Sequence, residues 1–444
     1  MKVINFILKM IILGVFSVVL YSCAQNKQWR SNFDLNCSPN NENTKCLIEK
    51  HENYDLAFLE FTERGNLFKS KAKKIVLSRI ESYSKKKEGI AVIVFVHGWK
   101  HNASFEDSNV VSFKKALNAV ASNKKNILGN RKIFGVYLGW RGLSLHGLWS
   151  ENLTFWDRKA VAQEIGKGGV TDTLLRLEQI DQHQKKNILF VVGHSFGGAV
   201  VLSALNETLL ERAIFKKFHP ENRMEQFGDG IILINPAIEA NQILQLVDVA
   251  HEITNNEQKI IHVISTEGDC ATKIAFPIGQ FLDQMFTLNH KILSRNYNKK
   301  SYAFSEYSLY LSTVGNYKPF HTRNLIKEKT TVQGVAASNN QIIEKWKYVN
   351  CCQNIEECNL SNDADFHISC HEDFPISFLY TSESFINDHN DVFNKNVLAY
   401  FSTVVSEALS KQDRKPFKEC TDQESGKFNF GNCFDFHYSK LTAQ

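Results

Sequence analysis

The sequence has no block of basic residues. Its formal net charge is +5 over 444 residues, and the charges are spread along the chain. Lys85–Lys87 is a short basic cluster of the kind found in solvated loops. Nucleic-acid-binding domains usually gather Lys and Arg on one face, so we expect no nucleic-acid partner. Internal repeats and low-complexity tracts are also lacking, and the apolar content of 43% is ordinary for a globular protein.

The ten cysteines include no clean C-x-x-C pair, which argues against a zinc site. Cys37 with Cys46, and Cys420 with Cys433, are near pairs, and four more cluster as Cys351, Cys352, Cys358 and Cys370. Local pairs in an exported chain predict disulfides. Two connectivities stay open within the cluster, because its two adjacent cysteines do not readily bond each other. Cys270 is left over; a free thiol is one interpretation, and we expect it rather to be a small buried apolar residue.

The sequence also lacks an apolar run of membrane-spanning length. Met10–Leu20 has the length of a signal-peptide core and follows the basic Lys2. The segment ends in LYSC, and it resembles a bacterial lipoprotein signal. This predicts a signal segment 1–23, lipidation of Cys23 and a membrane-anchored lipoprotein of the bacterial cell envelope. The alternative is an ordinary export signal cleaved nearby, which would give a periplasmic or secreted protein.

Apolar runs alternate with amphipathic stretches from Gly89 onward. The runs predict buried strands at Ile90–Val96, Ile133–Leu138, Ile188–Val192, Ile231–Ile234, Ile260–Ile264 and Ile376–Tyr380. The amphipathic stretches predict helices at Phe113–Val120, Arg158–Ile180 and Asn394–Leu409. This alternation predicts an α/β fold with a mostly parallel sheet flanked by helices.

Roughly a hundred residues separate the last two predicted strands, far more than one crossover helix needs. We therefore predict one main domain over 86–444, with an insertion or cap at about 272–375 and a disulfide-containing tail at about 411–444. The polar residues 24–85 are expected to form an N-terminal extension that packs on this domain as a leading strand or hairpin.

The segment Asn187–Leu205, NILFVVGHSFGGAVVLSAL, carries the strongest chemical signal. Its G-x-S-x-G pattern stands between a buried strand and a helix, as in a nucleophile elbow. Such a turn exposes the serine hydroxyl and aims the N-terminus of the following helix at charge that develops on the substrate. Ser195 is therefore the predicted nucleophile.

A nucleophilic serine needs a base and a group that orients the base, and after an elbow the chain order is acid, then histidine. The strand Ile260–Ile264 leads into a loop with two carboxylates, Glu267 and Asp269. We predict Asp269 as the acid, because the shorter side chain is the commoner orienter, and Glu267 is the alternative. Six histidines follow: His290, His321, His367, His371, His389 and His437. Only His389 lies between the last strand and the last helix, so it is the predicted base.

The oxyanion formed during acyl transfer needs backbone N–H donors. Phe196, directly after the nucleophile, and Trp99, in the loop HGWKHN after Val96, are the predicted donors. His97 and His194 are expected to orient loops and to take no part in proton transfer. Arg141 and His321 are predicted substrate contacts.

These motifs together resemble the α/β-hydrolase superfamily, specifically its serine esterase and lipase-like members. The resemblance covers about Gly89–Leu409, apart from the insertion, and Trp99 and Lys100 replace the glycines of an HGGG loop. It implies an exported serine hydrolase that cleaves carboxylic esters of small molecules or lipids through an acyl-enzyme, with no metal and no cofactor. The alternatives are a non-catalytic binding lipoprotein on this fold and a secreted phospholipase-type effector. The oligomeric state stays open.

Overall fold

The computed structural model describes residues 27–35, 37, 45–123, 128–143, 155–222, 224–253, 259–283, 292–297, 300–333, 340–350, 374–411, 432–435 and 438–439. Cys23 and the cysteine cluster from Cys351 to Cys370 lie outside these residues. Among the helices within them, none combines the length and the apolar character needed to cross a membrane.

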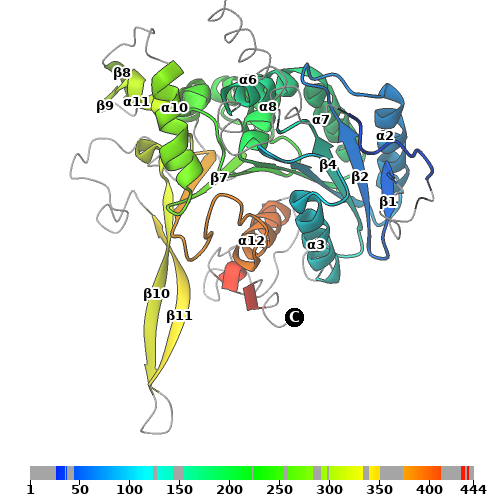
Figure 1. The fold of residues 1–444 in the computed structure, drawn as a ribbon. Coiled ribbons are helices and arrows are strands. Elements are labelled where there is room, and N and C mark those ends of the chain that lie inside the picture. Colours follow the sequence, from blue (N-terminus) through cyan, green and yellow to red (C-terminus); the bar gives the residue numbers. More distant parts are fainter. Residues whose placement is uncertain are drawn as a thin grey trace, which may run out of the picture.

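A mostly parallel sheet of ten strands runs through the described part of the chain (Figure 1). The strand order is β1-β2-β4-β3-β5-β6-β7-β12-β10-β11, and the two edge strands, β1 and β11, run antiparallel to their neighbours. The strands are β1 Ile48–Lys50, β2 Tyr54–Glu60, β3 Ile90–Val96, β4 Lys132–Gly139, β5 Ile188–His194, β6 Gly230–Ile234, β7 Ile261–Thr266, β10 Arg323–Gln333, β11 Asn340–Asn350 and β12 Ile376–Thr381. The predicted α/β class is confirmed, and the six predicted strands are β3 to β7 and β12.

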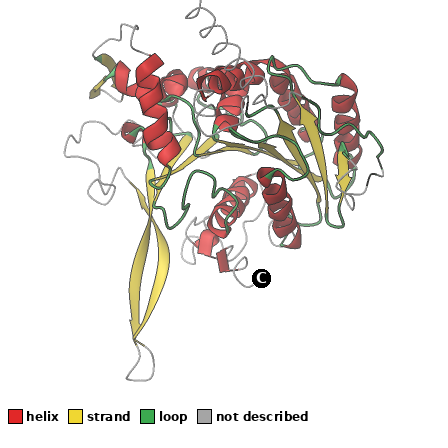
Figure 2. Cartoon of the chain, viewed as in Figure 1, coloured by secondary structure: helices red, strands yellow, loops and turns green. Residues whose placement is uncertain are grey.

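Helices cover both faces of the sheet (Figure 2). They are α2 Ser70–Ser84, α3 Ser108–Ser122, α6 Phe155–Ile165, α7 Thr171–Asp181, α8 Phe196–Phe218, α9 Leu244–Ala250, α10 Phe276–Asp283, α11 Glu306–Leu311 and α12 Lys395–Lys411. Successive strand residues point to opposite faces. Val92 and Val94 of β3 therefore join a core with α2, α7 and α8, whereas Ile93 and Phe95 join a second core with α3 and α12.

The strand order creates a topological switch at β3. This strand lies between β4 and β5, so the chain leaves β3 on one side and returns on the other. In open α/β sheets, ligands bind outside the carboxyl ends of the strands at such a switch. The turn with Ser195 follows β5, and the loop that begins at His97 follows β3. The topology thus brings both predicted catalytic loops to one crevice.

The N-terminal extension packs on the domain as the hairpin of β1 and β2, which joins the main sheet. β2 pairs in parallel with β4 over its full length, and β1 adds an antiparallel edge. α2 then leads into β3 as a crossover helix. The sequence reading missed β2, YDLAFLE, because two acidic residues interrupt its apolar run. Asp55 and Glu60 are nevertheless buried.

The insertion between β7 and β12 only partly follows the prediction of a cap. It contains α10, α11, the antiparallel pair β8 (Leu293–Tyr297) and β9 (Lys300–Phe304), and the long hairpin of β10 and β11. β10 extends the main sheet, pairing in parallel with β12 through residues 323–325. Farther along, the hairpin projects away from the sheet and helices (Figure 1).

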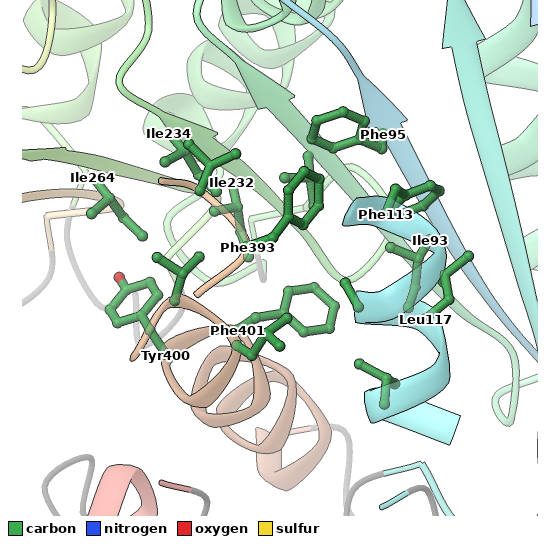
Figure 3. A pocket seen from close by; sticks show the side chains of 16 residues that line it. Ile93, Phe95, Phe113, Leu117, Ile232, Ile234, Ile264, Phe393, Tyr400 and Phe401 are labelled. Atoms are coloured by element: carbon green, nitrogen blue, oxygen red, sulfur yellow. The ribbon is translucent and has the colours of Figure 1, made fainter. Parts of the chain in front are cut away.

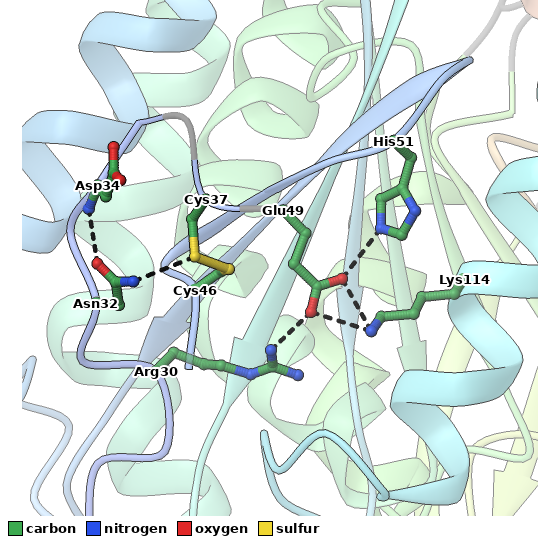
Figure 4. The surroundings of a disulfide bond; sticks show 8 residues. All are labelled: Arg30, Asn32, Asp34, Cys37, Cys46, Glu49, His51 and Lys114. Carbon is green, nitrogen blue, oxygen red and sulfur yellow. Dashed lines mark hydrogen bonds and ion pairs between the residues drawn. A yellow bond between two sulfur atoms is a disulfide. The ribbon is translucent and has the colours of Figure 1, made fainter. Parts of the chain in front are cut away.

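A buried ionic cluster fixes residues before β2 to the domain (Figure 4). Glu49 accepts hydrogen bonds from Arg30 at 2.7 Å and from Lys114 of α3 at 3.0 Å, and contacts His51 at 3.0 Å. Arg30 also donates to the carbonyl oxygen of Ala103 at 2.7 Å. The predicted disulfide between Cys37 and Cys46 is present beside this cluster. The ionic cluster therefore fixes the chain before β2 to the domain, and the disulfide closes a loop within that segment.

The remaining cysteines that the structure describes divide into two cases. Cys433 is disulfide-bonded, and its predicted partner Cys420 lies outside the described residues. Cys270 is a free and exposed thiol. The expectation of a buried apolar Cys270 is wrong, because the residue lies at the solvent side of the turn that begins after Asp269.

Candidate active site

Ser195 occupies a strained turn between β5 and α8. Its φ of 55° and ψ of −124° lie in a region that residues with a side chain rarely adopt. The turn is tight enough that a Cβ on Gly197 would stand 2.0 Å from the carbonyl oxygen of Val96. Strain of this kind persists only where the surroundings enforce it, and it clusters at functional sites. The glycine of the motif is therefore required by a backbone approach between α8 and β3.

The structure brings Ser195, His389 and Asp269 into one hydrogen-bonded chain. The Nε2 atom of His389 lies 2.8 Å from the Oγ of Ser195, and its Nδ1 lies 2.8 Å from the Oδ2 of Asp269. Because an ionised carboxylate only accepts, Nδ1 carries the proton and Nε2 accepts from the serine hydroxyl. Ser195 is 3% exposed and the His389 side chain 19%. The imidazole thus forms the accessible part of a largely buried array.

Asp269 is completely buried and remains ionised. Burial acts to raise the pKa of its carboxyl, but hydrogen bonds from His389 and Thr272 outweigh burial and lower the pKa. Glu267, the alternative acid, is exposed and accepts a 3.3 Å hydrogen bond from the backbone of Glu383. The geometry therefore selects Asp269 as the partner of His389.

Two side chains hold the backbone of His389. The Nε2 of His194 lies 2.8 Å from the carbonyl oxygen of His389, and the Nδ2 of Asn235 donates to the same oxygen at 3.2 Å. Burial lowers the pKa of His194 well below the ordinary value, so this ring is neutral and donates through Nε2. Asn235 was not predicted from the sequence. Its only signal is an amide residue directly after β6, at the same edge of the sheet as Ser195.

The loop after β3 lies directly against the nucleophile. A Cβ on Gly98 would stand 2.6 Å from the Cβ of Ser195, so no larger residue fits there. His97 orients the loop: its Nδ1 contacts the carbonyl oxygen of Gly98 at 2.9 Å, and its Nε2 accepts from the backbone N–H of Trp140 at 3.0 Å. Complete burial lowers the pKa of His97 to about 4, which keeps the ring neutral and available as an acceptor.

The two predicted substrate contacts have different surroundings. Arg141 adjoins the loop after β3, and its guanidinium is ion-paired with Glu63 at 2.9 Å. Its contact with substrate stays a prediction. His321 is buried, with its Nε2 3.0 Å from the carbonyl oxygen of Gly315 and its ring stacked on Tyr380. Its contact with substrate also stays a prediction.

An apolar cavity of about 50 Å³ lies between α3 and α12, on one face of the sheet (Figure 3). Phe393, Phe401 and Phe113 contribute to its walls, and Ser195, Asp269 and His389 do not line it. Apolar cavities of this size stay dry. We regard it as a packing gap behind the catalytic loops. Among the residues that the structure describes, no three His, Cys, Asp or Glu side chains group as metal ligands.

The family can now be assigned. A family described as alpha/beta hydrolase of unknown function (DUF900) matches residues 72–303, just over half of the 444-residue chain. The chain belongs to this family. The match includes the nucleophile turn and Asp269 and ends before His389.

Other comparisons add little to the family assignment. A solved structure, the phospholipase PlaB from Legionella pneumophila in complex with thio-NAD, is 12% identical, with a TM-score of 0.24. The similarity covers 72% of this chain and 64% of that phospholipase, less than two thirds of its length. Among curated proteins, nothing matches significantly. The α/β-hydrolase assignment therefore depends on the family match and on the fold itself.

Proposed function

We propose that this protein is a serine hydrolase that cleaves carboxylic ester bonds through an acyl-enzyme. The observation that carries the proposal is the chain of two 2.8 Å contacts that joins Ser195, His389 and Asp269. A hydroxyl is a weak nucleophile until a base within hydrogen-bonding distance can take its proton. His389 is such a base, and Asp269 fixes its tautomer.

The reaction proceeds in two halves. The Oγ of Ser195 bonds to the ester carbonyl carbon while its proton moves to the Nε2 of His389, and the carbonyl electrons move onto oxygen. The carbonyl re-forms as the carbon–oxygen bond to the alcohol breaks, and His389 returns the proton to the departing alkoxide. Water then attacks the acyl-enzyme with His389 as the base again, which releases the acid and restores Ser195.

The predicted oxyanion donors fit this reaction. Phe196 opens α8 directly after the nucleophile, where the helix N-terminus favours negative charge. Trp99 belongs to the loop whose Gly98 contacts Ser195. Two N–H groups aimed at the developing oxyanion would supply the largest single contribution to catalysis, since removal of one donor typically costs about 10²–10³ in rate.

The proposed setting is the bacterial cell envelope, with Cys23 lipidated. The Cys37–Cys46 disulfide supports export, because such bonds persist in oxidising compartments. A lipid anchor would keep the enzyme at a membrane, which favours esters of lipids and of membrane-partitioning molecules as substrates. Globomycin, which blocks lipoprotein processing, would cause the precursor to accumulate if Cys23 is the processing site.

The decisive experiment is hydrolysis of a series of p-nitrophenyl esters, from short to long acyl chains, by wild type and Ser195→Ala. Ser402→Ala is a matched control, because it removes a buried hydroxyl that bonds only the helix carbonyl of Leu398. We expect activity to vanish in the first variant and to persist in the second. The acyl length of highest activity separates an esterase from a lipase. Equal background rates in wild type and Ser195→Ala, with no labelling by a fluorophosphonate, would instead indicate a non-catalytic binding protein.

A further inference from the structure

We propose that Thr272 and Asn316 are positioning residues for the acid of the triad, so that the insertion completes the active site. The proposal deepens, and rests on, the proposed serine hydrolase function. It arises from a run of hydrogen bonds that starts in the insertion and ends at Ser195, and the sequence gives no motif for its outer half.

Thr272 bonds both oxygens of Asp269. Its backbone N–H donates to Oδ1 at 3.0 Å, and its hydroxyl donates to Oδ2 at 2.6 Å. Both residues are buried, at 1% and 0% exposed. The same Oδ2 accepts from the Nδ1 of His389. The turn Ala271–Ala275 thus holds both oxygens of the carboxylate through Thr272, and this orients Oδ2 toward the imidazole.

Asn316 holds the hydroxyl of Thr272 from the opposite side. The Nδ2 of Asn316 donates to the Oγ1 of Thr272 at 2.9 Å and to the Oγ1 of Thr313 at 2.9 Å. A hydroxyl has a single hydrogen, so the Thr272 oxygen that accepts from Asn316 must give its hydrogen to Asp269. A donor placed on that oxygen polarises the hydroxyl and strengthens the bond that it donates.

Asn316 is itself fixed to the catalytic edge of the sheet. The backbone N–H of Asn316 donates to Thr313 at 3.0 Å, and Val314 donates to the carbonyl oxygen of Ile238 at 2.8 Å. Ile238 belongs to the loop after β6, in which the N–H of Ala237 bonds the carbonyl oxygen of Ser195 at 3.1 Å. The insertion therefore contacts the nucleophile side and the acid side of the site at once.

A packing role and a positioning role make different predictions. A methyl group could replace the hydroxyl of Thr272 in volume, but it could neither donate to Asp269 nor accept from Asn316. A carboxylate that loses this donor holds a protonated imidazole more strongly, so a higher pH is needed to free the base. The acid limb of the pH–rate profile should then move to higher pH, which a loss of packing alone would not cause.

The other titratable groups around Asp269 are few among the described residues. They are His389 from the loop after β12, Tyr380 of β12, and Glu267, Cys270 and Lys273 on its own loop and turn. The ring of His194 in β5 faces His389, with 5.0 Å between the ring centroids, and burial keeps it neutral by lowering its pKa. Burial and the nearby carboxylates raise the pKa of Tyr380 to about 12, so this phenol stays neutral over the range of the profile.

The experiment compares Thr272→Val, Thr272→Ser and Asn316→Ala with wild type. Thr173→Val is the matched control, because it removes a buried hydroxyl of α7 that, among the described residues, bonds the carbonyl oxygen of Gly169 in the turn before this helix. The measurements are kcat/KM for a p-nitrophenyl ester and the rate of fluorophosphonate labelling of Ser195, both as functions of pH, with melting curves to show folding.

We expect Thr272→Val to lower both rates by about ten- to a hundredfold and to move the acid limb upward. Thr272→Ser should restore the limb, Asn316→Ala should shift it less in the same direction, and Thr173→Val should leave it in place. An unmoved limb in Thr272→Val, with rates within about twofold of wild type, overturns the proposal.

Two further outcomes are decisive. If Thr272→Val does not fold, Asn316→Ala decides alone, because it leaves both bonds from Thr272 to Asp269 in place, and an unchanged limb overturns the proposal. If wild type neither hydrolyses esters nor becomes labelled, the proposed function and this inference fail together. Labelled wild type with unchanged variants overturns the positioning role alone.

Discussion

Glu49 and Asp269 are both buried carboxylates that accept several hydrogen bonds, and comparing them separates an anchor of the fold from the candidate active site. Glu49 contacts two cations, Arg30 and Lys114, and the ring of His51, and Arg30 continues the chain of contacts to the carbonyl oxygen of Ala103. Asp269 is surrounded by neutral donors, Thr272 and the imidazole of His389. The imidazole of His389 in turn contacts the hydroxyl of Ser195, a residue with a strained backbone.

A buried, hydrogen-bonded carboxylate is therefore no sign of catalysis by itself. Both carboxyls are ionised, and the pKa of both is lowered. What distinguishes Asp269 is a partner that can take up a proton and lies within reach of a nucleophile. Neutralising each carboxylate in turn should separate the two roles, one through activity and the other through stability.

Asp269→Asn should have the largest effect. The amide keeps the shape but favours the wrong imidazole tautomer, so kcat should fall by about 10⁴ while the protein stays folded. Kinetics on a p-nitrophenyl ester and a melting curve check both parts. Glu267→Gln is the matched control, since Glu267 is exposed and its carboxylate accepts from the backbone N–H of Glu383. A comparable loss in Glu267→Gln would contradict the assignment of the acid.

Glu49→Gln should do the reverse. It leaves the buried Arg30 and the half-buried Lys114 without their counter-ion, and breaking a buried ion pair typically costs about 3–5 kcal/mol. The expected result is a lower urea midpoint with nearly unchanged kcat below the transition. The exposed Glu52→Gln serves as control. A large loss of kcat in folded Glu49→Gln would show that the anchor also shapes the loop at Ala103.

Acid should remove the contribution of Glu49 in a defined window. Burial acts to raise the pKa of Glu49, but the bond with His51 and the charges of Arg30 and Lys114 outweigh it and lower the pKa from 4.5 to about 2. A lowered pKa in the folded state gives stability that is complete above pH 4.5 and is lost as the pH falls toward 2. That difference corresponds to about 3 kcal/mol. Burial lowers the pKa of Arg30, which offsets part of it.

Unfolding of wild type and Glu49→Gln at several pH values measures this contribution. The difference in free energy of unfolding between the two proteins should shrink from pH 5 downward. If this free-energy difference stayed constant between pH 5 and 2.5, protonation of Glu49 would not be linked to unfolding. That result would contradict the lowered pKa.

The sequence predicted one half of the catalytic edge better than the other. Ser195 and the loop after β3 belong to short local motifs. Their glycines are required, because a Cβ on Gly197 or Gly98 would stand only 2.0 or 2.6 Å from a neighbouring atom. The six apolar strands were equally easy to predict from the sequence, because strands buried on both faces need continuous apolar runs.

The other half is assembled over long distances in the sequence. Asp269 and His389 are 120 residues apart, and Asn316 meets Thr272 across 44. The order of strand, loop and helix identified His389, but no spacing rule could relate Asn316 or Asn235 to it. β2 was missed for a similar reason: Asp55 looks like a surface residue until Lys132 of β4 pairs with it at 2.8 Å.

Asn235→Gly should have the smallest effect and sharpens the comparison most. Asn235 has a φ of 45°, which glycine adopts without strain, so the substitution removes the side chain and preserves the turn. Its loss frees the carbonyl oxygen of His389 from one of two donors, while His194 keeps the other. We expect kcat to fall by about tenfold and stability by about 1 kcal/mol. Asn235→Ala should cost more stability at a similar kcat, since alanine adds strain at this φ. If instead kcat is unchanged in Asn235→Gly and only the melting temperature falls, then His194 alone positions the base, and the second donor belongs with Glu49 among the anchors of the fold.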